Sequence, residues 1–257
     1  MPDARDRFAP CALIPIYNHG STIARTVHAL RAHGLPVLVV DDGSDAPTRN
    51  VLDALARDTD GMRLLRLPCN QGKGRAIAAG LLAAHEAGYS HALQIDADGQ
   101  HDTGDVPRFL DAGRAHPHAL VCGTPVYDAS VPRARLYGRY VTHACVWLET
   151  LSLALRDSMC GYRLYPLHAA CAEIARRPPP ARMDFDTAIA VRLMWRGVPV
   201  ANLPTRVTYP ENGLSHFRMF RDNLRISAMH ARLLLGMLPR APRLVWRRLH
   251  GENPCVD

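Results

Sequence analysis

The chain has 257 residues, of which 47% are hydrophobic and 21% are charged, so it can bury a core and lacks the composition of a disordered chain. Its net charge is +7, and Lys73 is the single lysine among its basic residues. This charge suits phosphates, nucleic acid or an anionic membrane surface, although a merely solvated basic surface has the same composition.

Cysteine usage and the length of apolar runs predict where the protein works. The seven cysteines form no CxxC pair, which is typical of a reducing compartment. Residues 1–10 contain no apolar leader, and no uninterrupted apolar run approaches the ~20 residues that a membrane-spanning helix needs. We therefore expect a cytoplasmic protein whose membrane contact is at most peripheral, at the inner face of the cytoplasmic membrane.

Short apolar segments alternate with helical patterns through the first half of the chain. The sequence predicts strands at 11–17, 36–41, 62–67, 91–96 and 119–123, and helices at 20–33, 46–58, 73–87 and 104–115. The strand segments are almost continuously apolar, as are parallel strands that are buried on both faces. The alternation predicts an α/β fold with a Rossmann-like, mainly parallel sheet flanked by helices.

Polar clusters follow four of these strands. The clusters are YNHGS after the first strand, DDGSD after the second, CNQGKGR after the third and DADGQHD after the fourth. Parallel strands end at one edge of their sheet, and α/β proteins bind ligands beyond that edge. The four clusters therefore predict a single site.

The fourth cluster packs acidic side chains so closely that they repel one another unless a cation joins them. Asp96 and Asp98, with the amide oxygen of Gln100, offer the hard oxygen ligands that Mg²⁺ or Mn²⁺ prefers. Such an ion would also bind a diphosphate. The alternative is a loop that caps the following helix through Asp102 or Thr103, which explains Asp102 but not the other two carboxylates.

The second and third clusters suit a nucleotide. Asp42 stands in a Gly–Ser turn, where it can accept hydrogen bonds from a base or a ribose, although DDGS is also a common turn sequence. Lys73 and Arg75 begin a helix between glycines, and a helix N-terminus attracts anions. The spacing is not that of a Walker A loop, and no GxGxxG follows the first strand.

The second half of the chain has a different pattern. It predicts helices at 134–155 and 184–196, two short strands at 198–203 and 206–209, and an arginine-rich amphipathic stretch at 216–250. We expect one domain over 1–214 and a helical extension over 215–257. Packing on the domain is favoured for the first half of this extension, and contact with anionic lipid for its tail. His216 is a further candidate metal ligand.

Six segments of the chain resemble family-2 glycosyltransferases of the GT-A fold, especially those that act on dolichyl or polyprenyl phosphate. They are IPIYNHG, VVDDGSD, NQGKGRAI, QIDADGQHD, DSMCGYRLYP and MDFDTAIAVRLMWRG, in the family's order over about residues 10–210. The resemblance implies an inverting transfer of a sugar from a UDP-, GDP- or dTDP-linked donor. The implied acceptor is a lipid-linked phosphate or another lipid intermediate at the membrane.

The resemblance also implies roles for individual residues. The implied donor-binding residues are Pro15, Tyr17, Asn18, Asp42, Lys73, Arg75 and Asp96. The implied metal ligands are Asp96, Asp98 and Gln100. The implied catalytic residues are Asp98, Asp157, Asp184, Asp186 and Arg163, and the implied acceptor contacts are Gly161, Tyr162, Arg133 and Arg139.

The chain departs from the family's pattern at two places. Many relatives have GSR where this chain has GTP at 123–125, so that an arginine contact would pass to Arg133, Arg135 or Arg139. Ala188 stands where many relatives carry a glutamate. A hydroxyl acceptor would then need Asp184 or Asp186 as its base, whereas a phosphate acceptor is already anionic and needs none.

Two other functions fit parts of the sequence. A metal-dependent nucleotidyltransferase would also use such a sheet, but its glycine- and arginine-rich loop after the first strand is missing. A basic nucleic-acid-binding protein would explain the charge, yet it leaves the acidic cluster unexplained and no recognised motif for it occurs. We therefore expect no nucleic-acid partner.

Overall fold

A computed structural model describes residues 7–126, 133–207, 219–250 and 255–256, with side chains except at 133–137 and 219–220. Its described strands form one sheet in the order β3-β2-β1-β4-β6-β5-β7. The strands are β1 (Pro10–Ile16), β2 (Val37–Asp41), β3 (Met62–Arg66), β4 (His91–Gln94), β5 (Leu120–Val126), β6 (Arg163–Pro166) and β7 (Val200–Arg206). Only β6 runs antiparallel to its neighbours, so the mainly parallel sheet is confirmed.

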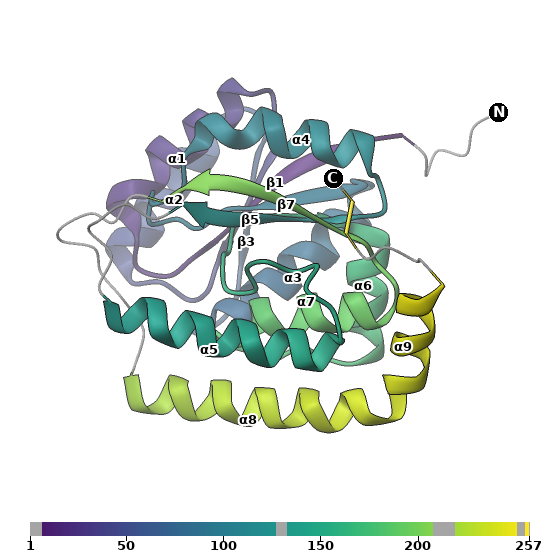
Figure 1. The fold of residues 1–257 in the computed structure, drawn as a ribbon. Coiled ribbons are helices and arrows are strands. Elements are labelled where there is room, and N and C mark those ends of the chain that lie inside the picture. Colours follow the sequence, from purple (N-terminus) through teal and green to yellow (C-terminus); the bar gives the residue numbers. More distant parts are fainter. Residues whose placement is uncertain (1–6, 127–132, 208–218, 251–254, 257) are drawn as a thin grey trace.

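Helices cover both faces of the sheet (Figure 1). One face carries α1 (Gly20–Ala32), α2 (Ala46–Asp58), the 3₁₀ turn η2 (Thr103–Asp105) and α4 (Val106–Ala115). The other carries α3 (Lys73–Glu86), α5 (Arg133–Thr150), α6 (Leu167–Arg176) and α7 (Phe185–Trp195). Alternate residues of β1 pack against opposite faces, Leu13 towards α3 and Ile14 towards α1, which is why this strand is apolar throughout.

The C-terminal part forms a further layer outside α5. It consists of α8 (Met219–Met237), the 3₁₀ turn η3 (Leu238–Arg240) and α9 (Ala241–Leu249). Met229 and Leu233 of α8 belong to the same core as α7, and His230 Nδ1 lies 2.7 Å from Glu149 Oε1 of α5. The first half of the extension therefore packs on the domain, as expected. The domain boundary at 214/215 lies outside the described residues and stays a prediction.

Three sequence predictions differ from the structure. The helix predicted at 134–155 is α5, which ends at Thr150. In place of the predicted break after residue 203 there is one strand, β7, which continues through Pro204, while residues 208–209 of the second predicted strand lie outside the described residues. This is compatible with its position at the sheet edge, where a residue without an N–H is tolerated. Strand β6 was not predicted, because it is only four residues long. All four pair with β4, and two of them also pair with β5. None of the described helices is both long and apolar enough to cross a membrane.

Candidate active site

The polar clusters after β1, β2 and β4 are hydrogen-bonded to one another at the carboxyl edge of the sheet. Asn18 adopts a left-handed conformation with a φ of 57°, which asparagine tolerates better than most residues. Its side-chain Oδ1 accepts from the backbone N–H of Asp45 at 2.8 Å, and its backbone N–H donates to Ser44 Oγ at 3.1 Å. Thr22 Oγ1 donates to the Ala97 carbonyl at 2.6 Å. The predicted convergence of these clusters is confirmed.

Asp42 joins the third cluster to the second. Its two carboxylate oxygens accept from the Gln71 and Gly72 amides at 2.7 and 2.8 Å. Burial raises the pKa of Asp42, and the two amide hydrogen bonds oppose that rise. The structure thus shows this carboxylate holding the loop that precedes Lys73, while its contact with a base or ribose stays a prediction.

The glycines of the third cluster admit another protein segment. Gly72 has a φ of +102°, and a Cβ there would lie 2.4 Å from the Ala181 carbonyl oxygen. A Cβ on Gly74 would lie 2.4 Å from the Pro180 carbonyl oxygen. The Arg75 amide donates to the Ala181 carbonyl at 3.1 Å, while the Arg75 side chain is exposed. These glycines therefore allow the loop before α7 to pack against the start of α3.

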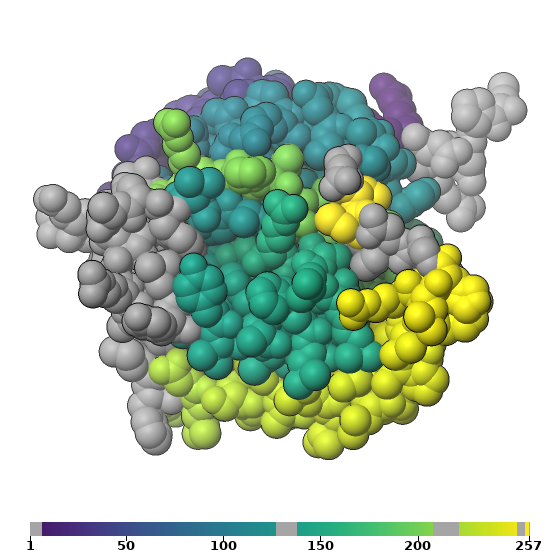
Figure 2. All heavy atoms as spheres, viewed as in Figure 1, coloured from purple at the N-terminus to yellow at the C-terminus, as the bar shows by residue number. Residues whose placement is uncertain are grey.

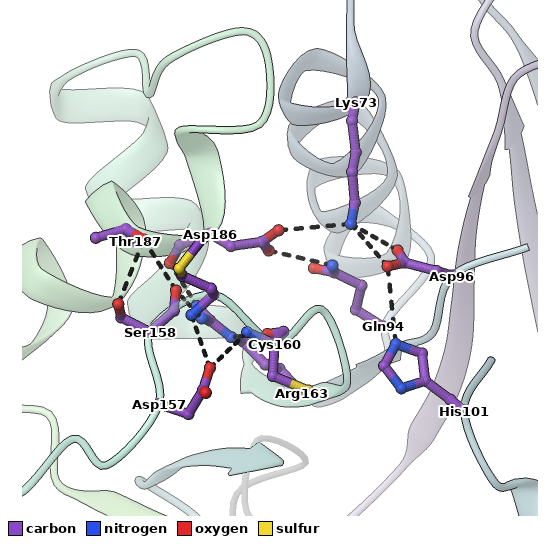
Figure 3. Close-up of polar contacts among 11 residues, drawn as sticks. Lys73, Gln94, Asp96, His101, Asp157, Ser158, Cys160, Arg163, Asp186 and Thr187 are labelled. Carbon is purple, nitrogen blue, oxygen red and sulfur yellow. Dashed lines mark hydrogen bonds and ion pairs between the residues drawn. The ribbon is translucent and has the colours of Figure 1, made fainter. Parts of the chain in front are cut away.

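That packing brings Lys73 between two aspartates from different parts of the chain (Figure 3). Lys73 Nζ lies 2.7 Å from Asp96 Oδ1 and 3.6 Å from Asp186 Oδ2. Gln94 Nε2 donates to Asp186 Oδ1 at 3.2 Å. Burial alone would lower the pKa of Lys73, but the charges of Asp96 and Asp186 outweigh it and raise that pKa above the ordinary lysine value. Lys73 is therefore a permanent cation at the centre of the cluster.

The two carboxylates of the DxD segment, which is Asp96-Ala97-Asp98 in this chain, differ in their surroundings. Burial alone would raise the pKa of Asp96, but Lys73 and His101, whose Nε2 lies 3.7 Å from Oδ2, hold it well below the ordinary range. Burial and the charge of Asp96 instead raise the pKa of Asp98, whose Oδ1 accepts from the Gln100 amide at 3.0 Å. Asp98 is thus the carboxylate whose charge is least compensated.

This arrangement fits a divalent cation. The carboxylates of Asp96 and Asp186 lie within 3.6 Å of the Lys73 ammonium group, and Asp98 acts on that group through its charge. Carboxylates are hard oxygen ligands. Within the described ranges, no three His, Cys, Asp or Glu side chains already converge as a metal site. The residues thus suit an ion that takes most of its ligands from a substrate and water, as Mg²⁺ does. The amide oxygen of Gln100 stays a predicted ligand, and His216 lies outside the described residues.

A cavity of about 650 Å³ opens beyond the ends of β2 and β3. Tyr17 lines it, as predicted for a donor-binding residue, and so does Asn70, three residues before Lys73. Arg49 and Arg66 also line it. Arg66 Nε donates to Asp41 Oδ2 at 3.3 Å, so this wall carries a cation that the sequence analysis did not single out.

The DSMCGYR segment lies beside the carboxylate cluster, and its aspartate pairs with a predicted acceptor contact. Arg139 Nε donates to Asp157 Oδ2 at 2.5 Å, and His143 Nε2 lies 3.4 Å from the same oxygen. The Met159 and Cys160 amides donate to Asp157 Oδ1 at 2.8 and 2.7 Å. Burial alone would raise the pKa of Asp157, but His143 and Arg139 hold it far below the ordinary range. Asp157 is therefore an ionised carboxylate that organises this loop.

Arg163 is fully buried and positions the same loop against α7. Its Nε donates to the Cys160 carbonyl at 2.8 Å and its Nη2 to the Ser158 carbonyl at 2.6 Å, while Nη1 donates to the Asp186 carbonyl. These three carbonyls engage all three of its nitrogen atoms. The geometry thus favours a positioning role over the predicted catalytic contact with substrate.

Four other predicted site residues have the following positions in the structure. Tyr162 is buried and stacks on Phe109 with ring centroids 4.2 Å apart, so it packs beneath the site instead of facing an acceptor. Pro15 is likewise buried within β1. Asp184 directly precedes α7 and is 8% exposed. Arg133 begins α5, but its side chain lies outside the described part.

Two residues in contact with Asp96 or Asp186 were also missed by sequence reasoning. Gln94 ends β4, directly after Ala92 and Leu93, and contacts Asp186; a buried polar residue at that position was the available signal. His101 lies within the acidic segment that was singled out, yet no role was assigned to it. Its ring lies 5.1 Å from that of Tyr162, which holds the imidazole beside Asp96.

The ionic network of Asp157 makes a testable contribution to stability. A carboxyl whose pKa is lowered on folding stabilises the protein above its ordinary pKa of 3.8, and this contribution is lost as pH falls through the folded value. Asp157→Asn should therefore lower the free energy of unfolding by about 2 kcal/mol at pH 7, and this difference should narrow below about pH 4. Urea unfolding of both proteins across this pH range measures it.

The matched control is Asp111→Asn, which removes one partner of an ion pair with Arg114 whose aspartate side chain is 72% exposed. An exposed pair contributes little, so this variant should differ from wild type by less than about 0.5 kcal/mol at every pH. A loss at Asp157 that does not change with pH would show that the carboxylate contributes through packing and not through its charge.

The mainly parallel sheet, with the carboxylates of Asp96 and Asp98 beyond the end of β4, has the GT-A fold. The sequence profile of Glycosyl transferase family 2 matches residues 11–171. The chain belongs to this family.

Two proteins of similar sequence have names that describe mannose transfer and a polyprenol or its phosphate. The chain is 28% identical over 238 residues to polyprenol monophosphomannose synthase of Mycolicibacterium smegmatis, covering 83% of this chain and 82% of that protein. It is 31% identical over 217 residues to undecaprenyl-phosphate mannosyltransferase of Micrococcus luteus, covering 80% and 86%.

Solved structures share the fold at lower identity. Glucosyl-3-phosphoglycerate synthase of Mycobacterium tuberculosis, in complex with Mn²⁺, UDP and phosphoglyceric acid, matches with a TM-score of 0.65 at 18% identity, over 92% of this chain and 80% of that one. The mannosyltransferase PcManGT of Pyrobaculum calidifontis, in complex with GDP-Man and Mn²⁺, matches with a TM-score of 0.56 at 16% identity, over 98% and 78%. These two likenesses establish the fold.

Proposed function

We propose that the protein transfers a sugar from a nucleotide donor to the phosphate group of a polyprenyl phosphate. The observation that carries this proposal is the pairing of Lys73 with Asp96 and Asp186 at the carboxyl edge of the sheet, beyond which a cavity of about 650 Å³ opens at β2 and β3. The two sequence relatives described above support the lipid phosphate acceptor. A phosphate acceptor also agrees with Ala188, because an anionic nucleophile needs no general base at that position.

In the proposed reaction, an oxygen of the acceptor phosphate attacks the anomeric carbon of the donor. The bond from that carbon to the donor diphosphate breaks in the same displacement, and the nucleoside diphosphate leaves with the electron pair. Lys73 presents a fixed positive charge, and Asp186 and Gln94 keep its ammonium group in place. Charge that is already oriented before the reaction stabilises a developing anion without further reorganisation.

Mg²⁺ or Mn²⁺ is the proposed cofactor, with Asp98 and Asp96 as its protein ligands. When bound, it would neutralise charge on the leaving diphosphate. Asp96 would then share its carboxylate with Lys73, whose ammonium group also has Asp186 within 3.6 Å. The Mn²⁺ in the two solved complexes supports the choice of ion.

The direct test is transfer to a defined acceptor. With undecaprenyl phosphate and Mn²⁺, we expect a radiolabelled sugar to pass from GDP-mannose, UDP-glucose or a dTDP-sugar into the lipid phase. Addition of EDTA should lower the rate by at least about a hundredfold. Transfer that is unchanged by EDTA would contradict the role of the cation, and transfer only to a hydroxyl-bearing acceptor would contradict the phosphate acceptor.

Membrane contact by the C-terminal tail is a second part of the proposal. Figure 2 shows α5, α8 and α9 next to one another on one face of the molecule. Exposed apolar side chains occur on this set of helices, and they include Tyr140, Val141, Leu148, Trp246 and Leu249. Arginines of α9 accompany them, as on helices that lie in an anionic membrane surface.

Vesicle flotation tests this contact. We expect the protein to float with phosphatidylglycerol vesicles, and Trp246→Ser/Leu249→Ser to bind them roughly tenfold more weakly because it loses apolar area. Val51→Ser removes an exposed apolar side chain from α2 and should bind like wild type. Equal binding by all three proteins would contradict a membrane role for α9.

A further inference from the structure

A second cavity lies between the end of α6, the end of α7 and the η3–α9 segment. Its volume is about 350 Å³, and it shares no lining residue with the cavity beside Asp41. Six arginines line it together with a single carboxylate, that of Glu173. The arginines are Arg176, Arg177, Arg192, Arg196, Arg240 and Arg243.

Among the described residues that line the cavity, one carboxylate faces six guanidinium groups. Glu173 Oε2 lies 3.3 Å from Arg196 Nη1 and has no second carboxylate beside it among the residues that line the cavity. Arg240 packs over the Trp195 ring at 4.6 Å from its centroid and donates to the Gly236 carbonyl. These contacts hold the side chains in place but add no negative charge.

Arg192 is the buried member of the group. It is 8% exposed, and its Nη1 donates to the Arg177 and Pro178 carbonyls at 3.3 and 3.4 Å. Its Nε is buried and has no acceptor within the described part of the chain. Burial first, and then the charge of Arg177, lower the pKa of Arg192, while the charges of Glu173 and Asp184 oppose that shift. A buried N–H without an acceptor is costly, and a ligand that accepts from the Arg192 Nε would remove this cost.

We propose that this cavity binds a phosphate group that carries at least two negative charges. A guanidinium group donates two parallel hydrogen bonds that match the spacing of phosphate oxygens. Several guanidinium groups around one cavity favour a multiply charged anion over a carboxylate or chloride. The ligand is either the headgroup of a phosphate-monoester lipid or a soluble phosphate compound. The cavity is open to both, and α9 forms one of its walls.

Titration of the full chain with pyrophosphate in EDTA tests the proposal without sugar transfer and without metal at the carboxylate cluster. We expect calorimetry to detect binding by wild type, and Arg176→Gln/Arg177→Gln to weaken it by at least about tenfold. Both side chains are exposed, so the variant should fold, and circular dichroism checks this. Arg243 lines the cavity from α9, and Arg243→Gln should also weaken pyrophosphate binding.

The matched control is Arg57→Gln/Arg63→Gln, which removes two exposed arginines elsewhere and leaves the same net charge as the α6 double variant. It should bind pyrophosphate within about twofold of wild type. Equal weakening in both double variants would show general attraction to a basic protein and would overturn the proposal.

A flotation assay tells a lipid headgroup from a soluble phosphate compound. It compares binding to phosphatidic acid vesicles with binding to phosphatidylglycerol vesicles of equal surface charge. Preference for phosphatidic acid that is lost in Arg176→Gln/Arg177→Gln identifies a lipid headgroup. Pyrophosphate binding that depends on the same residues, without lipid preference, identifies a soluble phosphate compound. Failure of both probes to distinguish the α6 variant from its control would overturn the proposal.

Discussion

Asp98→Asn should lower the rate of sugar transfer by about a thousandfold while the protein remains folded. Asp98 is the carboxylate of the cluster whose charge is least compensated, because burial and the neighbouring charge of Asp96 raise its pKa. A bound divalent cation would remove this penalty, and an amide in place of the carboxylate would no longer attract the ion. Rates measured with a nucleotide-sugar donor at saturating Mn²⁺ give the effect on catalysis.

A second measurement separates lost metal binding from other causes. In wild type, Mn²⁺ and a nucleoside diphosphate together should raise the melting temperature more than either does alone, since each provides ligands for the other. Asp98→Asn should lose this joint effect. Asp102→Asn is the matched control, because Asp102 lies in the same loop and its carboxylate accepts from the Gly104 amide at 2.8 Å. Asparagine caps a helix about as well, so the control should remain active. Comparable losses in both variants would contradict a specific role for Asp98.

Sequence reasoning predicted the sheet edge and its polar clusters well, for a physical reason. Each cluster follows a continuously apolar segment, and parallel strands must place their carboxyl ends together. That rule predicts that Lys73 and Asp96, 23 residues apart in the chain, share one edge of the sheet, but the ion pair between them was not predicted. What the rule cannot supply is the orientation of side chains beneath the surface. Arg163 lies in the same segment as Asp157, yet it points inward to three carbonyls.

Sequence reasoning also failed to predict contacts between segments that are far apart in the chain. The glycines of the third cluster were interpreted as room for an anion, whereas the structure uses them to admit the carbonyls of Pro180 and Ala181. Nothing in the local pattern of residues 70–76 names that partner, because it lies more than a hundred residues further along the chain. The short strand β6 escaped prediction for a similar reason, since its position depends on pairing with β4 and not on a periodic pattern.

Gly161→Ala should lower the rate of sugar transfer by about a hundredfold at little cost in stability. A Cβ at this position would lie 2.7 Å from Asp96 Oδ2 and 3.1 Å from Lys73 Nζ, well inside van der Waals contact. The Asp96 carboxylate would have to turn away, which would break its contact with the ammonium group and spoil the predicted metal position. A displacement of about 1 Å at a reacting centre is enough for such a loss. Because the clash involves side-chain ends, the free energy of unfolding should fall by no more than about 2 kcal/mol.

The chain provides a matched control for this change. Gly138 lies in α5, and a Cβ there would meet nothing within 4 Å. Gly138→Ala should keep its activity and gain up to about 1 kcal/mol, because alanine favours the helix. Activity assays and urea unfolding of both variants therefore separate a general effect of the added methyl from the specific clash. If Gly161→Ala were fully active, Asp96 could not need the position in which Lys73 holds it, and its proposed part in binding the metal and the donor would be excluded.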